Sequence, residues 1–306
     1  MLARGISFSA VDPSDLDRLR SCVPDANVVL TPTFDAPIAG LCRSLELIVC
    51  SAAGTEGIDR AVVPRGVAVV HSTGHEYPMA EYVFGALVAL RQQFLRSDAG
   101  LRRGEWRYGY WGTRASLDEL YGSTLGIIGF GGIGLEVARR ARAFGMRCDA
   151  VTLHPDKAIE PGLLVGPPGA LTDASAVDAL VQTSDNLAVA CELSQLTRGL
   201  IDARRIGLMP KHALLVNVAR GPIVDERALY DALASKAIAG AAIDVWYHYP
   251  AGHPSTTMPS SLPFHELDNV LMTPHASGWT LGHRRRKLAF FASIINDHAT
   301  RRRGRA

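Results

Sequence analysis

The chain has 306 residues, of which 47% are hydrophobic and 20% charged, a composition typical of a globular protein with one large domain or two ordinary ones. No apolar run is long enough to cross a bilayer, and residues 1–10 lack the pattern of a secretory signal, so we expect a soluble, cytoplasmic protein with no membrane partner. The net charge is only +2, with the basic excess confined to residues 281–306, and the five cysteines lack metal-ligand spacing, so neither a nucleic-acid partner nor a metal site is expected.

Short apolar runs rich in β-branched residues recur along the chain and predict strands. These runs are Ala26–Leu30, Leu45–Cys50, Val67–His71, Thr124–Ile128, Arg147–Leu153, Asn186–Cys191, Ala213–Val218, Ile238–Ile243 and Val270–Thr273. Helix-like stretches separate many of them, the clearest being Pro78–Arg96, with Phe94 on its apolar stripe, Ile133–Phe144 and Leu281–His298. This alternation predicts an α/β fold with parallel sheets and crossover helices.

One long stretch, Tyr247–Leu267, is rich in Pro, Ser and His and has no periodic pattern. Connections of this length are unusual inside a compact domain unless they serve a function. The stretch is therefore predicted to be a loop that covers a site or contacts a partner.

A glycine-rich turn follows the run that ends at Ile128 and opens the predicted helix Ile133–Phe144. A GxGxxG pattern alone is weak evidence for a dinucleotide site. Between a strand and a helix, however, its glycines allow a tight turn, a close approach of the backbone to a pyrophosphate, and close packing of the helix on the strand. The helix N-terminus then offers N–H groups to the phosphates. The predicted cofactor-binding residues of this turn are Gly129, Gly131, Gly132, Ile133 and Gly134.

The choice between NAD and NADP depends on the residue that ends the second strand, where an acid would accept the ribose 2′-hydroxyl. Thr152 stands near that position, with Asp149 too early and Asp156 past the strand. Without a carboxylate a 2′-phosphate is tolerated, and His154 or Lys157 could meet it. The sequence therefore leaves NAD and NADP open, with a slight preference for NADP.

Three further stretches make the chain resemble the D-2-hydroxyacid dehydrogenases. They are Thr197–Ile201 leading into Ala213–Asp225, Gly240–Trp246, and Asn269–Gly278, which contains Thr-Pro-His. The resemblance implies a Rossmann domain over residues 77–279 inserted into a smaller, flavodoxin-like substrate domain of residues 1–76 and 280–306, with the active site in the cleft between them.

The resemblance also implies roles for individual residues. His275 would exchange the hydroxyl proton during hydride transfer, because the pKa of an imidazole lies near neutral pH. Arg220 would anchor the substrate carboxylate with its planar fork. Val218 and Asp244 would contact the cofactor, Asp244 at the nicotinamide carboxamide or ribose.

A glycine-rich loop at residues 50–59 resembles the family's substrate loop, in which backbone N–H groups of Ala53 and Gly54 would bind the substrate carboxylate. His75 stands at the hinge, where many members carry asparagine. A plain turn between a strand and a helix remains the alternative reading of the loop.

Two departures from the family pattern stand out. In the family the catalytic histidine is normally paired with a glutamate, or with a glutamine in formate dehydrogenases, five residues after the aspartate that ends the preceding strand. That count from Asp244 gives Tyr249. A neutral phenol offers at most a hydrogen bond, so we expect weaker support for protonated His275. The usual opening strand, first helix and next strand are also absent before the helix-like stretch at Asp15, which predicts a smaller, truncated substrate-domain sheet with an uncovered flank.

The sequence therefore predicts an NAD(P)-dependent oxidoreductase that reduces a small 2-oxo acid to the D-2-hydroxy acid. The alternative is a catalytically weak or inactive dinucleotide-binding regulator on the same fold. A homodimer is also expected, because Arg103–Gly112 is crowded with aromatic residues and Arg, which are enriched in interfaces, and this region packs against the second subunit in related enzymes.

Overall fold

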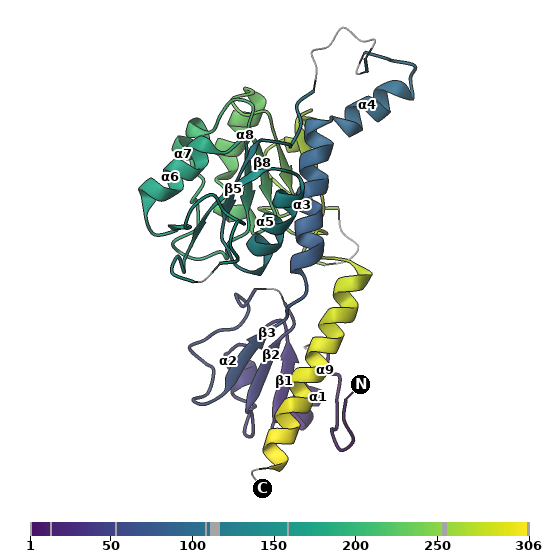
Figure 1. The fold of residues 1–306 in the computed structure, drawn as a ribbon. Helices are drawn as coiled ribbons and strands as arrows, with labels where there is room; N and C mark the ends of the chain where they lie inside the picture. Colours follow the sequence, from purple (N-terminus) through teal and green to yellow (C-terminus); the bar gives the residue numbers. More distant parts are fainter. Residues whose placement is uncertain are drawn as a thin grey trace. The chain divides into compact units, whose positions relative to one another are not determined.

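The computed structural model describes residues 2–12, 14–52, 54–107, 109–110, 117–157, 159–252 and 256–304 (Figure 1). The chain forms two compact units. Unit 1 consists of Met1–His75 and Thr280–Ala306, and unit 2 of Glu76–Trp279. Each unit has its own parallel sheet and its own hydrophobic core.

Unit 2 is built on a sheet that has seven strands, all parallel, within the described ranges. In spatial order these are β6 (Gly169–Ala170), β5 (Arg147–Thr152), β4 (Thr124–Ile128), β7 (Asn186–Val189), β8 (Leu214–Asn217), β9 (Gly240–Ile243) and β10 (Val270–Met272). The order reverses beside β4, as in Rossmann domains, where ligands bind outside the carboxyl ends of the strands at such a switch point. The predicted α/β fold with parallel sheets is confirmed.

Helices cover both faces of this sheet (Figure 1). One face carries α3 (Glu76–Arg91) and α5 (Gly132–Ala143), and the other carries α6 (Ala174–Thr183), α7 (Ala203–Leu208) and α8 (Glu226–Ala234). The strands β7, β8 and β9 are buried along their whole length, which explains why they appear in the sequence as continuous apolar runs.

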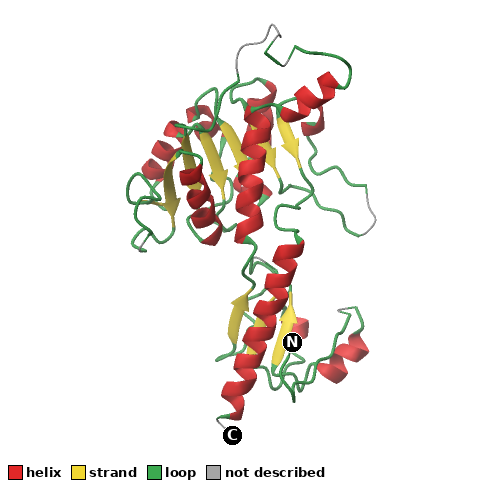
Figure 2. Cartoon of the chain, turned by 45° about the vertical axis from the view of Figure 1, so that its right-hand side comes forward, coloured by secondary structure: helices red, strands yellow, loops and turns green. Residues whose placement is uncertain are grey.

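Unit 1 has a parallel sheet in the order β1 (Val28–Thr31), β2 (Leu47–Cys50) and β3 (Ala68–His71). The long helix α9 (Leu281–Arg303) runs along one face of this sheet (Figure 2), where Phe291 packs on Leu47 and Val49. The two other helices of the described part of unit 1 are α1 (Leu16–Cys22) and α2 (Ala36–Ala39). In the described ranges, no helix is both long and apolar enough to cross a membrane.

The predicted single helix Pro78–Arg96 is wrong at its C-terminal end. Helix α3 ends at Arg91, and a separate helix α4 (Phe94–Leu101) begins after Gln93, whose φ of 50° and ψ of 43° lie in the left-handed region. The change of direction takes Phe94 off the buried stripe, and its side chain is 53% exposed. Gln93 is neither Gly nor Asn, so nothing in the local sequence marks the break.

The predicted loop Tyr247–Leu267 contains the short 3-10 helix η2 (Phe264–Glu266), and a second one, η1 (Gly221–Ile223), follows β8. The rest of the stretch is irregular, with residues 253–255 outside the described ranges. Phe264 is fully buried, and the Tyr247 hydroxyl donates to the Val224 carbonyl at 3.0 Å. Both ends of the loop are therefore packed onto unit 2.

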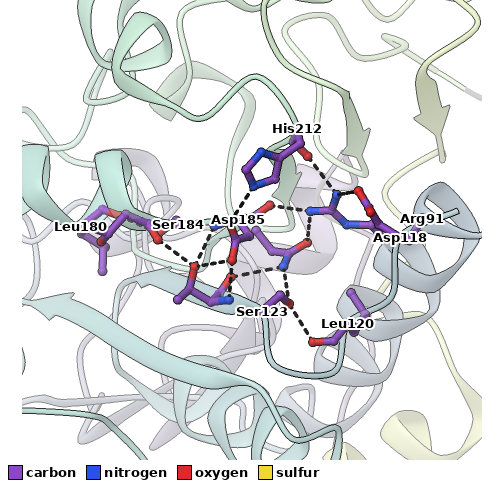
Figure 3. Close-up of polar contacts among 11 residues, drawn as sticks. Arg91, Asp118, Leu120, Ser123, Leu180, Ser184, Asp185 and His212 are labelled. Atoms are coloured by element: carbon purple, nitrogen blue, oxygen red, sulfur yellow. Dashed lines mark hydrogen bonds and ion pairs between the residues drawn. The ribbon is translucent and has the colours of Figure 1, made fainter. Parts of the chain in front are cut away.

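A buried polar network lies at the amino ends of β4, β7 and β8 (Figure 3). The Arg91 side chain is 8% exposed and donates to the carbonyls of His212 and Asp185 and to Asn186 Oδ1, at 2.7 to 3.0 Å. Asp185 in turn accepts from the Thr124 amide at 2.8 Å. Because Arg91 is the last residue of α3, these bonds tie that helix to the sheet edge opposite the carboxyl ends.

Candidate active site and dinucleotide site

The glycine-rich turn after β4 is shaped by two close backbone approaches. Gly129 has a φ of +97°, and a Cβ built on it would lie 2.6 Å from the backbone of Cys191, which follows β7. A Cβ on Gly134 would collide with the carbonyl oxygen of Gly129. Both positions therefore need glycine, one for the turn and one for helix–strand packing.

Gly131 differs from these two, since a Cβ built on it would meet no atom within 4 Å. It is the N-cap of α5 and has no side chain to satisfy the first N–H groups of that helix, which Gly132 and Ile133 begin. Open space in front of unsatisfied N–H groups suits a bound anionic group. The residues of the turn thus fit the pyrophosphate of a dinucleotide.

One neighbour of the turn was not predicted from the sequence. The side chain of Glu76, at the start of α3, lies against Gly132, so that a Cβ on Gly132 would be 2.7 Å from Glu76 Cγ. The contact joins residues far apart in the chain and has no local sequence signal.

The expected 2′-hydroxyl position falls at the end of β5. Thr152 is the last residue of that strand and is 8% exposed, and its Oγ1 accepts from the amide of His154 at 3.4 Å. His154 and Lys157 are exposed on the turn that follows. The strand β5 ends in Thr152 and not in a carboxylate, which would repel a 2′-phosphate.

His275 and Tyr249 meet after β10 and β9, respectively. The Tyr249 hydroxyl lies 3.0 Å from His275 Nδ1 and also accepts from the backbone amide of Trp246 at 3.1 Å. The two rings are tilted, with centroids 5.6 Å apart. The residue that the resemblance places at the family's glutamate position, Tyr249, is therefore in direct contact with His275.

The His275 loop is held by Asp244, which directly follows β9 and is fully buried. Its carboxylate accepts from Thr273 Oγ1 at 2.6 Å, from the Ala276 amide at 2.8 Å and from the Ser277 amide at 2.9 Å, and its carbonyl accepts from the His275 amide at 2.8 Å. His275 has a φ of 56°, a left-handed conformation that a non-glycine residue keeps only when its surroundings impose it.

Two further side chains support this loop and were not predicted from the sequence. The Tyr82 hydroxyl lies 2.7 Å from Thr273 Oγ1, and Trp246 Nε1 donates to the Thr273 carbonyl at 2.8 Å. Burial raises the pKa of Tyr82 to about 12, so its hydroxyl stays protonated at neutral pH. Both bonds reach Thr273 from distant parts of the chain.

Arg220 follows β8, between Asn217 at the strand end and η1. The Asn217 side chain donates to the Arg220 carbonyl at 3.0 Å and accepts from the Ala219 amide at 3.1 Å, which fixes the turn. One guanidinium nitrogen donates to the Ala219 carbonyl at 2.7 Å. Val218, in the same turn, is 1% exposed and has its backbone bonded to Val189.

The charges around His275 oppose one another. Burial of part of the ring lowers the pKa of His275 below its usual value, the Asp244 carboxylate raises it, and the Arg220 guanidinium lowers it. Burial also raises the pKa of Tyr249, against the Trp246 amide and Arg220. Neutral imidazole and neutral phenol are therefore the resting forms at neutral pH.

The residues predicted to bind the substrate carboxylate belong to unit 1, whereas His275, Tyr249 and Arg220 belong to unit 2. Ala53 lies outside the described residues. The Gly54 carbonyl accepts from Cys50 Sγ at 3.4 Å, and the space beside the Gly54 Cα is occupied by the Glu56 carboxylate. The His75 ring packs edge-on against His283 at 5.9 Å.

Comparison with known proteins supports the resemblance. The family model described as D-isomer specific 2-hydroxyacid dehydrogenase, NAD binding domain, matches residues 84–277. The chain is 32% identical over 268 residues to a glyoxylate reductase of Korarchaeum cryptofilum, with 86% of this chain and 75% of that protein covered. It is 35% identical over 240 residues to a D-3-phosphoglycerate dehydrogenase of Methanocaldococcus jannaschii, covering 78% of this chain but only 42% of that protein.

Among solved structures, the chain resembles a glyoxylate reductase from Paecilomyes thermophila. The TM-score is 0.74 at 25% identity, with 92% of this chain and 83% of that chain covered.

The open space at Gly131 leads to a test of the dinucleotide site. Gly131→Val should leave the thermal unfolding curve nearly unchanged and weaken dinucleotide binding by about tenfold or more, because the new side chain would fill the space left for the pyrophosphate. Binding of NADH and NADPH would be measured by calorimetry. Gly207→Ala, at another glycine with open space around its Cβ, is the matched control and should bind as the unaltered chain does. Equal affinities for the two variants would rule out the assigned site.

Proposed function

The chain belongs to the D-isomer specific 2-hydroxyacid dehydrogenase family, and from that premise we propose that it reduces a small 2-oxo acid to the D-2-hydroxy acid with a nicotinamide dinucleotide. One observation supports this most directly. The glycine turn, Arg220 and His275 all follow carboxyl ends of strands in one sheet, at β4, β8 and β10. That edge is where Rossmann domains bind their ligands.

Each of these residues has a proposed role in the reaction. Arg220 would bind the substrate carboxylate and polarise the adjacent carbonyl, because a guanidinium presents several donors in one plane. His275 would exchange the proton with the substrate oxygen, and Asp244 would keep its loop in place. Nicotinamide, when bound, supplies the hydride. The unit 1 residues Gly54 and His75 are proposed as further substrate contacts.

The substrate is proposed to be small because the relatives include glyoxylate and hydroxypyruvate reductases. Its identity would be tested by following oxidation of NADH and NADPH against glyoxylate, hydroxypyruvate, pyruvate and phenylpyruvate. Turnover of any of them supports the proposal. Dinucleotide binding without turnover of any would favour the second candidate, a catalytically weak or inactive dinucleotide-binding regulator, for which the supporting observation is that a phenol, Tyr249, contacts the His275 ring nitrogen Nδ1.

The cofactor preference is proposed to lean towards NADP, and Thr152 provides the test. Thr152→Asp should shift the ratio of Kd values towards NAD by about tenfold or more, because the new carboxylate would accept the ribose 2′-hydroxyl and repel a 2′-phosphate. The ratio cancels any general loss of affinity from placing a charge at this buried position. An unchanged ratio would show that the end of β5 does not face the adenosine ribose.

The catalytic roles are tested by two variants. His275→Ala should lower kcat/KM for reduction by about 10² to 10⁴, and Arg220→Met should lower it by about 10², mainly through KM. As a control, Arg227→Met removes an arginine that is exposed on α8 and should change neither kcat/KM nor KM. Full activity of His275→Ala on a substrate of the panel would exclude His275 as the proton-exchanging group.

The active form is proposed to be a homodimer. Large apolar side chains are exposed on α4 and just beyond it, namely Phe94, Leu95, Leu101, Trp106 and Tyr110, at 51% to 94%. They continue into the aromatic segment Arg103–Gly112, of which Tyr108, Trp111 and Gly112 lie outside the described residues. Such a concentration of exposed aromatic and aliphatic groups is typical of an interface.

Light scattering should give twice the 32.9 kDa mass of the chain at micromolar concentration. Leu95→Glu should shift the mass towards the monomer, because it would bury a charge in the interface. Val165→Glu, at an equally exposed apolar residue outside α4, should remain dimeric. A monomeric mass for the unaltered chain would contradict the proposal.

A further inference from the structure

We propose that Tyr249 fixes neutral His275 as the tautomer that carries its proton on Nε2, so that the resting site presents a hydrogen-bond donor to the substrate oxygen. The inference rests on the proposed function for its kinetic consequence. The tautomer itself is a property of the free protein.

The argument begins with the Tyr249 hydroxyl, which has one proton to donate. The backbone amide of Trp246 can only donate, so its bond at 3.1 Å uses a lone pair of the phenolic oxygen. Of the two partners that the described residues give this oxygen, the remaining one is His275 Nδ1 at 3.0 Å. An unprotonated imidazole nitrogen is a good acceptor and a phenol is a good donor, so the phenol proton lies between the oxygen and Nδ1.

The opposite tautomer satisfies fewer groups. With the proton on Nδ1, the phenolic oxygen would accept two N–H groups, and its own proton would lose the protein acceptor 3.0 Å away. A carboxylate at this position would behave in the reverse way. It can only accept, so it selects the Nδ1–H tautomer and leaves a lone pair on Nε2. With Tyr249 in place of the family's glutamate, the ring proton is therefore carried by Nε2 instead of Nδ1. The substitution also removes a negative charge.

The charged groups around the ring allow this neutral form. Those that act on His275 are Asp244 and Arg220, which oppose each other, while Tyr249 itself is neutral. Asp244 reaches the His275 loop through the backbone amides of Ala276 and Ser277 and through Thr273, and its carbonyl binds the His275 amide. None of these bonds involves a ring nitrogen of His275, so Tyr249 determines the tautomer.

The tautomer distinguishes the two directions of the reaction. The carbonyl oxygen of a 2-oxo acid is an acceptor and matches Nε2–H, whereas the hydroxyl of a 2-hydroxy acid must give its proton to a lone pair that Nε2 does not offer. In reduction a hydride, which a bound nicotinamide would supply, would form the C2–H bond, and the carbonyl π pair would move to oxygen. That oxygen takes the Nε2 proton, and Nδ1 takes the Tyr249 proton.

Burial and the Asp244 charge disfavour the phenolate left on Tyr249 and raise the pKa of its hydroxyl, and the Trp246 amide and the positive charge of Arg220 offset part of this effect. The ring is then protonated on Nδ1. Because His275 is exposed, water can protonate Nε2 after product release, and Nδ1 then returns its proton to the phenolate, which restores the resting form. One hydride and one proton are consumed in each turnover. Reduction therefore does not require imidazolium, and Tyr249 acts through His275 as a positioning residue and proton source.

The tautomer can be read directly from the ¹⁵N chemical shifts of the His275 ring in protein labelled at histidine, with His275→Gln to assign the signals. We expect protonated Nε2 and unprotonated Nδ1 in the unaltered chain at neutral pH. Tyr249→Glu should reverse the assignment or give imidazolium, and Tyr249→Phe should give a mixture. Tyr247→Phe, which removes a phenol bonded to Val224, is the matched control and should leave the His275 shifts unchanged. A protonated Nδ1 in the unaltered chain would overturn the inference.

Kinetics provide the second readout. For the unaltered chain, kcat/KM for reduction should stay level as pH rises through the pKa of His275, whereas Tyr249→Glu should give a profile that falls above the pKa of its imidazolium. Tyr249→Phe should lower kcat by about tenfold or more with little change in KM, because the proton source is lost while Arg220 still binds the substrate. A falling profile in the unaltered chain would also overturn the inference. Absence of turnover on every 2-oxo acid would instead contradict the proposed function, while the shifts still decide the tautomer.

Discussion

The site depends on one buried carboxylate. Asp244 is fully buried, and an ionised side chain in that position is stable only if its oxygens are hydrogen-bonded. The donors come from the segment after β10, namely Thr273, Ala276 and Ser277, so this segment has to fold back over the end of β9. That fold places His275 in a left-handed conformation beside Tyr249.

The sheet separates this chemistry from the polar groups that stabilise the domain. At the amino ends of β4, β7 and β8, Arg91 and Asp185 bind backbone groups and close off the end of α3. At the carboxyl ends lie the groups assigned to ligand binding: the first N–H groups of α5, the guanidinium of Arg220 and the imidazole of His275. A parallel sheet supports this division because all strands end at the same edge.

The parts predictable from the sequence were those governed by local spacing. The apolar runs of the strands follow from burial on both faces of the sheet, and the glycine turn follows from backbone geometry. The first and last residues of each predicted strand lie within two residues of those of an observed strand. The partner of His275 was found by counting from Asp244 as the family resemblance implies, and the count holds because Asp244 and Tyr249 lie on one short segment after β9. The break at Gln93 was missed because a left-handed glutamine has no sequence signature, and its cause lies in packing beyond the helix. The contacts of Glu76 with Gly132 and of Tyr82 with Thr273 join distant segments, and a single sequence contains no signal for them.

Spacing also could not show what the substitution at Tyr249 does. A tyrosine in place of a glutamate suggests only a missing charge, and by that reasoning the histidine has simply lost support for its protonated form. The structure adds the Trp246 amide, which occupies one side of the phenolic oxygen and directs the phenol proton towards Nδ1. Burial lowers the pKa of His275 and disfavours imidazolium, so the same substitution favours a neutral ring with its proton on Nε2. A carboxylate partner makes the histidine a stronger base. A phenol partner makes it a hydrogen-bond donor that can receive a second proton at Nδ1 when it gives up the proton on Nε2. The chemistry of one side chain therefore decides which ring nitrogen of His275 carries the proton in the resting protein.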